Sequence, residues 1–593
     1  MFEKVLVANR GEIAIRVMRT LKEMGIVSVG VYSEADRDAP HVGEADEAYL
    51  LGPQVPAESY LYVERLLETA ENAGVQAIHP GYGFLAENPA FAKACEDAGI
   101  VFIGPPASAI EAMGSKTRAR ELMAEAGVPI VPGTTSPVET VAKAKKAAKE
   151  IGYPVACKAA GGGGGKGFRV AQSEDELEDA FEGAAREGEK FFSDPTVYLE
   201  RYLDDPRHVE VQVLADSHGN VIHLGERDCS IQRRHQKLIE EGPAPHVDDE
   251  MRERIGKIAT DAAAAVGYRS AGTVEGLQDG EDYFFLEMNT RIQVEHCVTE
   301  MATGIDIVRE QVLIADGEEL SITQDDVELR GHAIECRINA EAAHKNFAPA
   351  PGKITTYVEP AGPGVRVDSG VRAGSEVTPL YDPMVAKLIV WDTDRERATA
   401  RMLRALGEYE IGGLVTLIPF HRAILATDQW RNAETARDLI ADRKWLKSLE
   451  PEAEPRPEPA ADGEGEGEEA LSRTYKVEID GRLHRVKVIG AAASAAGNPG
   501  PAAGLRRPPR RERAAGGPAG GGATDVLVSP IQGTVLKVPV SKGDEVAEGA
   551  LICVIEAMKM ENEITADRAG KISELTVTEG GSVAAGDTIA RIE

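Results

Sequence analysis

The chain has 593 residues, 98 of them acidic and 66 basic, which gives a formal net charge of −32. One hydrophobic core does not organise a chain of this length, so we expect about three to five domains. The acidic excess argues against nucleic acid and against an anionic membrane surface as partners, because both attract basic patches. No apolar run reaches the roughly 18 residues of a transmembrane helix, and the six cysteines form no CxxC pair. We therefore expect a protein of the reducing cytoplasm.

The N-terminal part is predicted to be an α/β domain. Val5–Ala8 and Val27–Tyr32 are short apolar runs on either side of a helical pattern at Ile13–Met24. This strand–helix–strand order is typical of a parallel sheet with helices on its faces. The first turn, Asn9–Glu12, lacks a GxGxxG pattern, so a nicotinamide cofactor is not indicated.

A glycine-rich segment follows a lysine in the next part of the chain. The apolar run Pro154–Cys157 leads into Lys158 and the five glycines Gly161–Gly165, and a second apolar run follows at Phe168–Ala171. Glycine lets backbone N–H groups converge on phosphate oxygens, and lysine supplies charge. The segment therefore predicts a polyphosphate site, although it is not a Walker A loop. The alternative, a flexible linker, is disfavoured by the two flanking strands.

Two polar stretches come next. Glu226–Lys237 is dense in basic and amide groups, which suits an anionic substrate, with a surface charge run as the alternative. Further on, Glu275 precedes a stretch in which every second residue is polar: Glu287, Asn289, Arg291, Gln293 and Glu295. On one strand these five side chains would share a face. Two carboxylates and an amide on paired strands suit Mg²⁺.

The C-terminal part contains an internal repeat. Gly533–Glu556 and Gly570–Glu593 have equal length and matching glycines. Two such halves predict a quasi-symmetric β-sandwich, and Lys559 falls in the connection between them. Before this repeat we expect an acidic linker at 447–472, a β-hairpin segment at 473–490 and a flexible Ala/Gly/Pro linker at 491–523.

The run Ala557-Met558-Lys559-Met560 between the half-repeats resembles the biotinyl domain of biotin-dependent carboxylases, in which the lysine carries biotin through an amide. A lipoyl domain has the same fold but usually lacks the paired methionines, so lipoylation is the weaker alternative. Lysine, glycine run and acidic stretch together resemble the ATP-grasp family, and within it biotin carboxylase, over residues 1 to about 445.

This resemblance implies an α/β multidomain protein with four folded parts. They are a Rossmann-like N-terminal domain at 1–113, an ATP-grasp α+β domain at 114–328, a small carboxylase C-terminal domain at 329–446 and an all-β biotinyl (barrel-sandwich) domain at 524–593.

The resemblance also implies ligands for individual residues. The ATP phosphates would be held by Lys116, Lys158, Gly161, Gly162, Gly163, Gly164 and Gly165. The rest of the nucleotide would be lined by Glu200, Leu203, His208, Gln232 and His235. Mg²⁺ or Mn²⁺ would be bound by Glu275, Glu287 and Asn289. Bicarbonate would be bound by Lys237, Arg291, Gln293, Val294 and Glu295.

In the implied reaction Glu295 is the base for bicarbonate, which attacks ATP to give carboxyphosphate. Arg337 would stabilise the enolate of biotin, with a structural salt bridge as the alternative role. Asp382 is expected to pair with Arg16.

The implied function is ATP-dependent carboxylation of biotin on Lys559. No second large catalytic domain is recognisable, so one expected partner is a carboxyltransferase on a separate subunit. The others are a biotin protein ligase and a second copy of the carboxylase unit within a larger complex. An acyl-CoA carboxylase acting on acetyl-CoA or propionyl-CoA is expected. A split-subunit pyruvate carboxylase and a different ATP-grasp ligase are the alternatives. A carrier with a decayed ATP site is disfavoured, because all the expected residue types are present.

Overall fold

The computed structural model describes residues 1–134, 136–163, 166–192, 194–234, 236–449, 470–479, 482–491, 526–529, 533–557, 560–583 and 586–593. The chain divides into two compact units, residues 1–450 together with 525–593, and residues 451–524. None of the described helices is both long and apolar enough to cross a membrane.

The N-terminal domain is built on a five-stranded parallel sheet of order β3-β2-β1-β4-β5. Its strands are β1 (Lys4–Val7), β2 (Val27–Ser33), β3 (Glu47–Gly52), β4 (Ala77–His79) and β5 (Val101–Phe102). Helix α1 (Gly11–Glu23) buries Ile13, Val17 and Leu21 together with strand residues of the sheet. The predicted strand–helix–strand order is confirmed.

The strand order reverses between β1 and β4, the place where doubly wound sheets commonly bind nucleotides. In this chain, contacts within the protein fill that place at the edge of the sheet. The Asn9 side chain donates hydrogen bonds to the carbonyl oxygens of Pro80 and Tyr82, each at 2.7 Å. Gly370 lies so close that a Cβ on it would stand 2.7 Å from the Glu12 backbone nitrogen. This packing agrees with the absence of a GxGxxG pattern in the first turn.

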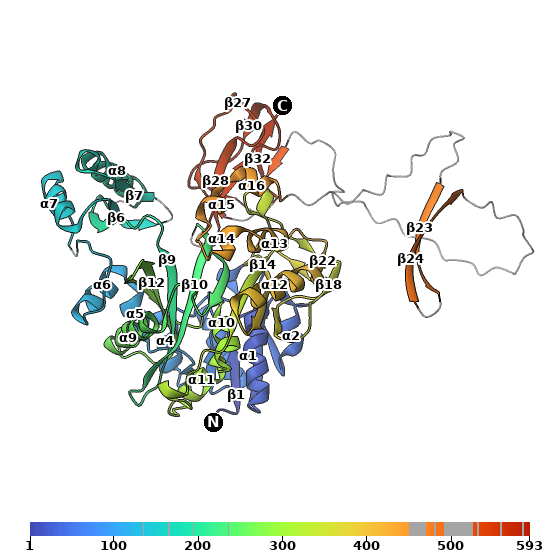
Figure 1. The fold of residues 1–593 in the computed structure, drawn as a ribbon, viewed down its shortest axis with the longest axis horizontal. Helices are drawn as coiled ribbons and strands as arrows, with labels where there is room; N and C mark the ends of the chain where they lie inside the picture. Colours follow the sequence, from blue (N-terminus) through green and yellow to red (C-terminus); the bar gives the residue numbers. More distant parts are fainter. Residues whose placement is uncertain are drawn as a thin grey trace, which may run out of the picture. The chain divides into compact units, whose positions relative to one another are not determined.

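An eight-stranded antiparallel sheet is formed by strands between residues 207 and 392, in the order β13-β12-β9-β10-β11-β14-β21-β19; Figure 1 labels β12, β9, β10 and β14 of this sheet. Its strands are β9 (Arg207–Ala215), β10 (Val221–Arg233), β11 (Gln236–Gly242), β12 (Ser270–Asp279), β13 (Asp282–Asn289), β14 (His332–Asn339), β19 (Val365–Ser369) and β21 (Met384–Asp392). Strands β11 and β14 pair with Glu240 opposite Glu335. The sheet therefore runs without a break across residue 328, where we expected one domain to end.

Helices cover this sheet. Helix α9 (Asp249–Ala265) starts at the N-cap Asp248, whose side chain accepts from the Met251 backbone, and buries Ala259 and Ala263 in the same core as Val211 of β9. Helices α10 (His296–Thr303) and α11 (Ile307–Ala315) follow β13.

A three-stranded sheet of order β7-β6-β8 groups with helices α7 (Val141–Ile151) and α8 (Glu174–Phe192) (Figure 1). Its strands are β6 (Val155–Gly163), β7 (Lys166–Ala171) and β8 (Val197–Arg201). Strand β6 continues into the glycine run, and Gly163 pairs with Lys166. Gly161, Gly162 and Gly163 thus belong to strand β6, and Gly164 and Gly165 lie outside the described residues.

The C-terminal domain consists of two four-stranded sheets of order β25-β32-β30-β27 and β29-β28-β26-β31. Its strands are β25 (Val526–Val528), β26 (Gly533–Lys537), β27 (Glu545–Val546), β28 (Leu551–Ala557), β29 (Met560–Thr565), β30 (Gly570–Leu575), β31 (Ser582–Val583) and β32 (Thr588–Ile592).

The two half-repeats exchange strands, because β27 of the first half pairs with β30 of the second and β31 pairs with β26. The matched glycines have matched conformations, with φ of +102° at Gly543 and +81° at Gly580, and of +83° at Gly549 and +90° at Gly586. This left-handed region favours glycine. The predicted quasi-symmetric sandwich is confirmed.

Strands β28 and β29 pair at Ala557 and Met560. Lys559 falls between these two strands in sequence and lies outside the described residues. In the other unit, β23 (Ala470–Ile479) and β24 (Arg482–Ala491) form an antiparallel pair, as expected for the β-hairpin segment at 473–490.

Candidate active site

Three buried carboxylates surround the ammonium group of Lys237. Its Nζ lies 2.5 Å from Glu210, 2.8 Å from Glu275 and 2.7 Å from Glu295. Burial alone would lower the pKa of Lys237, but the three carboxylates raise it well above its ordinary value. Burial likewise opposes charge on Glu295, whereas Lys237 and Arg337 lower its pKa below the usual range. The ammonium of Lys237 and the carboxylate of Glu295 are therefore both ionised and in contact. An acidic substrate could replace one of these contacts.

Glu275 is the hub of a second set of contacts. Its Oε1 accepts from Asn289 at 2.8 Å and from Gln293 at 2.6 Å, and its Oε2 lies 2.9 Å from His208 Nε2. Although burial opposes charge on Glu275, Lys237 and His208 hold its pKa well below the usual range.

Glu287 lies directly opposite Glu275 on the neighbouring strand. An ionised carboxylate with a second carboxyl group across the ladder is the oxygen donor set that Mg²⁺ and Mn²⁺ prefer. The residues present therefore fit a divalent cation. Its binding would replace hydrogen bonds that Glu275 now accepts.

The expected single polar face over residues 287–295 is wrong. Strand β13 ends at Asn289, and Glu295 is the N-cap of α10. The strand ends because the backbone N–H of Thr290 donates to Glu87 at 3.1 Å instead of continuing the ladder. Arg291 donates to the same Glu87 through Nε at 3.0 Å and to Asn289 at 3.0 Å. A loop anchored on the N-terminal domain, not strand alternation, therefore brings these polar groups together.

Arg227 is a central residue that the sequence did not single out. Its side chain is fully buried, and its nitrogens make five hydrogen bonds, to Glu210 (2.6 Å), Gln212 (2.9 Å), Thr299 (2.9 Å), Thr273 (3.4 Å) and Gln293 (2.9 Å). A guanidinium has five N–H groups, so this one is fully used. Arg227 fixes Glu210 and Gln293, which in turn contact Lys237 and Glu275.

Arg337 lies on β14, beside the Lys237 group. Its Nε donates to Glu240 at 2.6 Å and one terminal nitrogen donates to Glu295 at 2.9 Å, and 12% of its side chain is exposed. His421 contacts the Arg337 carbonyl oxygen at 2.8 Å. Arg337 thus forms the salt bridge that was the alternative to its expected role, with Glu240, and also reaches the carboxylate of Glu295.

The proposed nucleotide residues fall into separate groups. Lys158 and Glu200 form an ion pair on the sheet β7-β6-β8, and Arg120 contacts Glu200 at 2.9 Å. Leu203 is buried with Val131 and Phe284. Gln232 is the ladder partner of Lys237.

Two further placements complete the predicted set. The Val294 carbonyl accepts from Lys387 at 2.8 Å. His235 and the side chain of Lys116, the first residue of α6 (Lys116–Glu125), lie outside the described parts of the chain.

The expected pairing of Asp382 with Arg16 is wrong. Arg16 donates to Glu300 at 2.7 Å and to Asp306 at 2.8 Å, because its helix α1 lies against α11. Asp382 instead accepts from the Met384 backbone at 2.9 Å.

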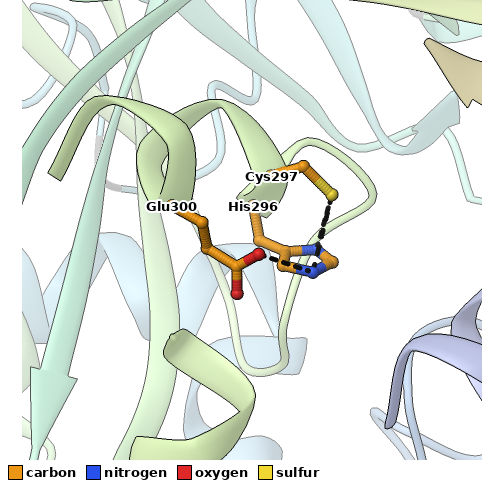
Figure 2. A group of neighbouring side chains, drawn as sticks. All are labelled: His296, Cys297 and Glu300. Atoms are coloured by element: carbon orange, nitrogen blue, oxygen red, sulfur yellow. Dashed lines mark hydrogen bonds and ion pairs between the residues drawn. The ribbon is translucent and has the colours of Figure 1, made fainter. Parts of the chain in front are cut away.

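Helix α10 carries a His296, Cys297 and Glu300 group that resembles a metal site by residue type (Figure 2). Glu300 is already neutralised by Arg16 and Arg366, each at 2.7 Å. Burial, with the charges of nearby cations, lowers the pKa of His296 to about 3. The group therefore acts as an internal ion-pair network that fixes α10, whose N-cap is the Glu295 of the active site.

Comparisons with known proteins agree along the chain. Residues 1–110 match the model for the biotin carboxylase N-terminal domain, 115–323 match the ATP-binding domain of the carbamoyl-phosphate synthase L chain, and 335–442 match the biotin carboxylase C-terminal domain. Residues 525–592 match the model "biotin-requiring enzyme". A pyruvate carboxylase subunit of Methanothermobacter thermautotrophicus is 58% identical over 434 residues, which cover 73% of this chain and 88% of that protein.

The chain belongs to the biotin carboxylase family.

The likeness extends over the full length in one relative. The biotin-dependent acyl-coenzyme A carboxylase alpha3 subunit of Mycobacterium leprae is 46% identical over 598 aligned positions, covering 100% of this chain and 98% of that protein. Among solved structures, the biotin carboxylase of Campylobacter jejuni in complex with a β,γ-ATP compound has a TM-score of 0.69 and 48% identity, covering 74% of this chain and 98% of that one.

A second structure is the biotin carboxylase domain dimer of Hydrogenobacter thermophilus 2-oxoglutarate carboxylase, with MgADP and bicarbonate. It has a TM-score of 0.67 and 51% identity, covering 73% of this chain and 96% of that one. This biotin carboxylase is therefore an ATP-dependent ligase, joined to a C-terminal domain of the kind that carries covalent biotin.

Proposed function

We propose that the chain is the carboxylase and carrier subunit of an acyl-CoA carboxylase that acts on acetyl-CoA or propionyl-CoA, and that a separate subunit supplies the carboxyltransferase. The supporting observation is the full-length likeness to an acyl-CoA carboxylase alpha subunit, which includes the region between the carboxylase and the biotinyl domain. The domain boundaries expected from the sequence, a dimer of the carboxylase unit and recognition by a biotin protein ligase belong to this proposal.

In the proposed reaction, Lys237, Arg291, Gln293 and the Val294 backbone bind bicarbonate, and Glu295 removes its proton. The depressed pKa of Glu295 keeps it ionised, and arrival of the anion at Lys237 would weaken the 2.7 Å ion pair that now holds it. Loss of that pair raises the basicity of Glu295 when the substrate is in place. Bicarbonate can then attack the γ-phosphate of ATP to give carboxyphosphate.

The phosphates carry several negative charges that the protein has to offset. Lys116, Lys158 and the glycine run Gly161–Gly165 would hold them, while Glu275, Glu287 and Asn289 would hold the divalent cation. Glu200, Leu203, His208, Gln232 and His235 would line the rest of the nucleotide. Closure of the β7-β6-β8 group over ATP would exclude water.

Transfer of the γ-phosphate to bicarbonate releases ADP, and carboxyphosphate then breaks down to CO₂ and phosphate. The phosphate takes the N1 proton of biotin as N1 bonds to the carbon of CO₂. We propose that this biotin is attached to Lys559 through an amide. Arg337 would turn its exposed edge toward the biotin ring and stabilise negative charge on the ureido oxygen. The terminal nitrogen that contacts Glu295 also lies 2.6 Å from Glu240, so Glu240 would keep hold of the guanidinium when the contact to Glu295 is lost.

A split-subunit pyruvate carboxylase is the second candidate, because the M. thermautotrophicus protein has the higher identity of the two, over the carboxylase part. The deciding experiment purifies the biotinylated chain from its host together with its bound partner. The complex is then supplied with ATP, Mg²⁺, labelled bicarbonate and one acceptor at a time. We expect label in acetyl-CoA or propionyl-CoA products. Label in the pyruvate product alone would overturn the acyl-CoA proposal and leave the carboxylase half-reaction intact.

A further inference from the structure

Two buried glutamates lie beside Arg337, and the reaction proposed above gives neither of them a contact with substrate. Glu240 on β11 and Glu335 on β14 are directly opposite each other in the antiparallel ladder, and both side chains are fully buried. Opposed residues of such a ladder have Cβ atoms about 4.5–5.5 Å apart. Glu335 and Arg337 are two positions apart on one strand, so they share a face of the sheet.

The hydrogen bonds of this pair are incomplete. Glu240 Oε1 accepts from Arg337 at 2.6 Å, but Glu240 Oε2 has no partner among the residues that the structure describes. Within the same described residues, neither carboxyl oxygen of Glu335 has a partner. An ionised carboxylate left this way would be costly, whereas a protonated carboxyl group could donate to the unused oxygen of its neighbour.

Both cationic and anionic groups surround the pair. Arg337 and Lys237 on neighbouring parts of the sheet, and Lys387 on β21, are cationic groups, and Glu295 adds a further negative charge. Burial, opposed in part by Arg337, raises the pKa of Glu240 to about 7. Burial raises the pKa of Glu335 well above its ordinary value, and Lys387 only partly offsets this. Two carboxyl groups this close cannot both ionise easily.

We propose that Glu335 carries a proton that it shares with Oε2 of Glu240, so that the pair bears one negative charge and holds the Arg337 guanidinium in place for biotin. Glu240 is then a positioning residue for Arg337, and Glu335 keeps Glu240 oriented without adding a second charge. The neutral member matters because a second anion would hold the guanidinium more tightly inside the protein and away from the ring. The link to biotin rests on the function proposed above, but the shared proton does not.

Three variants of the full chain separate these roles. Glu335→Gln replaces a neutral acid by a neutral amide of the same shape. Glu240→Gln removes the negative charge that lies beside the Arg337 guanidinium. Glu310→Gln is the control, since Glu310 is a buried glutamate of α11 whose carboxylate contacts Ser321, away from this group.

The first readout is infrared difference spectroscopy at neutral pH. We expect a protonated-carboxyl band in the unmodified chain and in Glu310→Gln that is missing from Glu335→Gln. Identical bands in the unmodified chain and Glu335→Gln would overturn the proposal, whatever the enzyme's activity.

The second readout is ATP hydrolysis with bicarbonate, with and without free biotin. In Glu335→Gln both rates should stay within about threefold. In Glu240→Gln the biotin-stimulated rate should fall by about tenfold or more, as expected for a misplaced catalytic group, and by a larger factor than the rate without biotin. An equal fall of both rates in Glu240→Gln, or a loss of biotin stimulation in Glu335→Gln as large as in Glu240→Gln, would contradict the positioning role. A chain without any bicarbonate dependence would instead count against the proposed function.

Discussion

At the scale of single residues, the site depends on cations that are matched by carboxylates deep in the protein. Lys237 contacts three of these carboxylates, those of Glu210, Glu275 and Glu295. The fully buried Arg227 donates hydrogen bonds to Glu210, whose charge it compensates, and to Gln293, which it orients. Removing one partner of such a group leaves an uncompensated charge in a medium that solvates it poorly.

Arg227→Met should therefore lower the free energy of unfolding by about 3–5 kcal/mol, because Glu210 would lose its 2.6 Å partner while remaining buried. Urea unfolding of the variant and the unmodified chain measures this change. Arg186→Met is the matched control, since Arg186 is 71% exposed and pairs with Glu182 on its own helix. Its effect should stay within about 0.5 kcal/mol. Equal effects of the two substitutions would contradict the role assigned to Arg227.

The sequence identified Lys237, Glu275, Glu295 and Arg337, because each lies in a stretch with a distinctive pattern or family resemblance. It did not identify Arg227 or Glu240. Arg227 lies in a run of charged residues that could equally cover a surface, and only the pairing of β9, β10 and β12 buries it. The partner of a buried charge is a property of strand register, which local sequence does not specify.

At the scale of elements, the hairpin of β12 and β13 sets two carboxyl groups opposite each other. If Glu275 and Glu287 hold the divalent cation, Glu287→Gln should raise the Mg²⁺ concentration required for half-maximal ATP hydrolysis by at least about tenfold. A titration of activity with Mg²⁺ measures this. Glu281→Gln, at an exposed position of the same hairpin, is the control and should leave the titration unchanged. An unchanged requirement in Glu287→Gln would remove it from the metal site.

Helix α13 (Ile418–Leu425) is tied to β14 by the His421 contact to the Arg337 carbonyl oxygen. Burial lowers the pKa of His421 to about 4, against an ordinary value of about 6.5. The unfolded chain therefore binds a proton at this histidine before the folded chain does. Its contribution to stability is complete above pH 6.5 and is lost as the pH falls toward 4, by up to about 1.4 kcal/mol per pH unit.

His421→Gln should flatten the decrease in stability between pH 6.5 and pH 4, because glutamine can donate to the same carbonyl without titrating. Thermal unfolding across this pH range measures the slope. His246→Gln removes a partly exposed histidine that also contacts a backbone carbonyl, at 3.1 Å, and should flatten the slope less. A slope that His421→Gln leaves unchanged would contradict the buried, neutral state of this histidine.

Strand alternation predicted the polar face of Glu287 and Asn289 correctly and failed from Arg291 onward. The failure has a physical cause, since the loop leaves the ladder to reach Glu87, more than two hundred residues earlier in the chain. The glycine run shows the converse case. The sequence placed the end of the strand at Lys158, before the glycines, yet β6 continues to Gly163, which pairs with Lys166 of β7.

At the scale of the whole molecule, the repeat in the C-terminal domain was predictable because each half carries its own glycines and apolar runs. The continuous sheet across the ATP-grasp and C-terminal parts was not, because β11 and β14 are separated by about ninety residues and meet only in the fold. This pairing places Lys237, proposed to bind bicarbonate, and Arg337, proposed to contact biotin, on adjacent strands of one sheet.

The proposed division of labour between carboxylase and carrier predicts that Lys559→Arg abolishes covalent biotinylation but leaves ATP-dependent carboxylation of free biotin within about twofold. Arginine keeps the charge but cannot form the amide. Avidin blotting and a free-biotin assay measure the two properties. Lys571→Arg, on β30 of the same domain, is the control and should remain biotinylated. If Lys559→Arg were still biotinylated, another residue would have to be the attachment site.

The most direct test of the central claim is ATP hydrolysis by the purified chain with Mg²⁺, with and without bicarbonate and free biotin, compared between the unmodified chain and Glu295→Gln. We predict hydrolysis that requires bicarbonate, rises with biotin, and falls by about 10²-fold or more in Glu295→Gln, the scale expected for loss of a general base. Hydrolysis indifferent to bicarbonate, or unaffected by Glu295→Gln, would contradict the assignment of this site to bicarbonate activation.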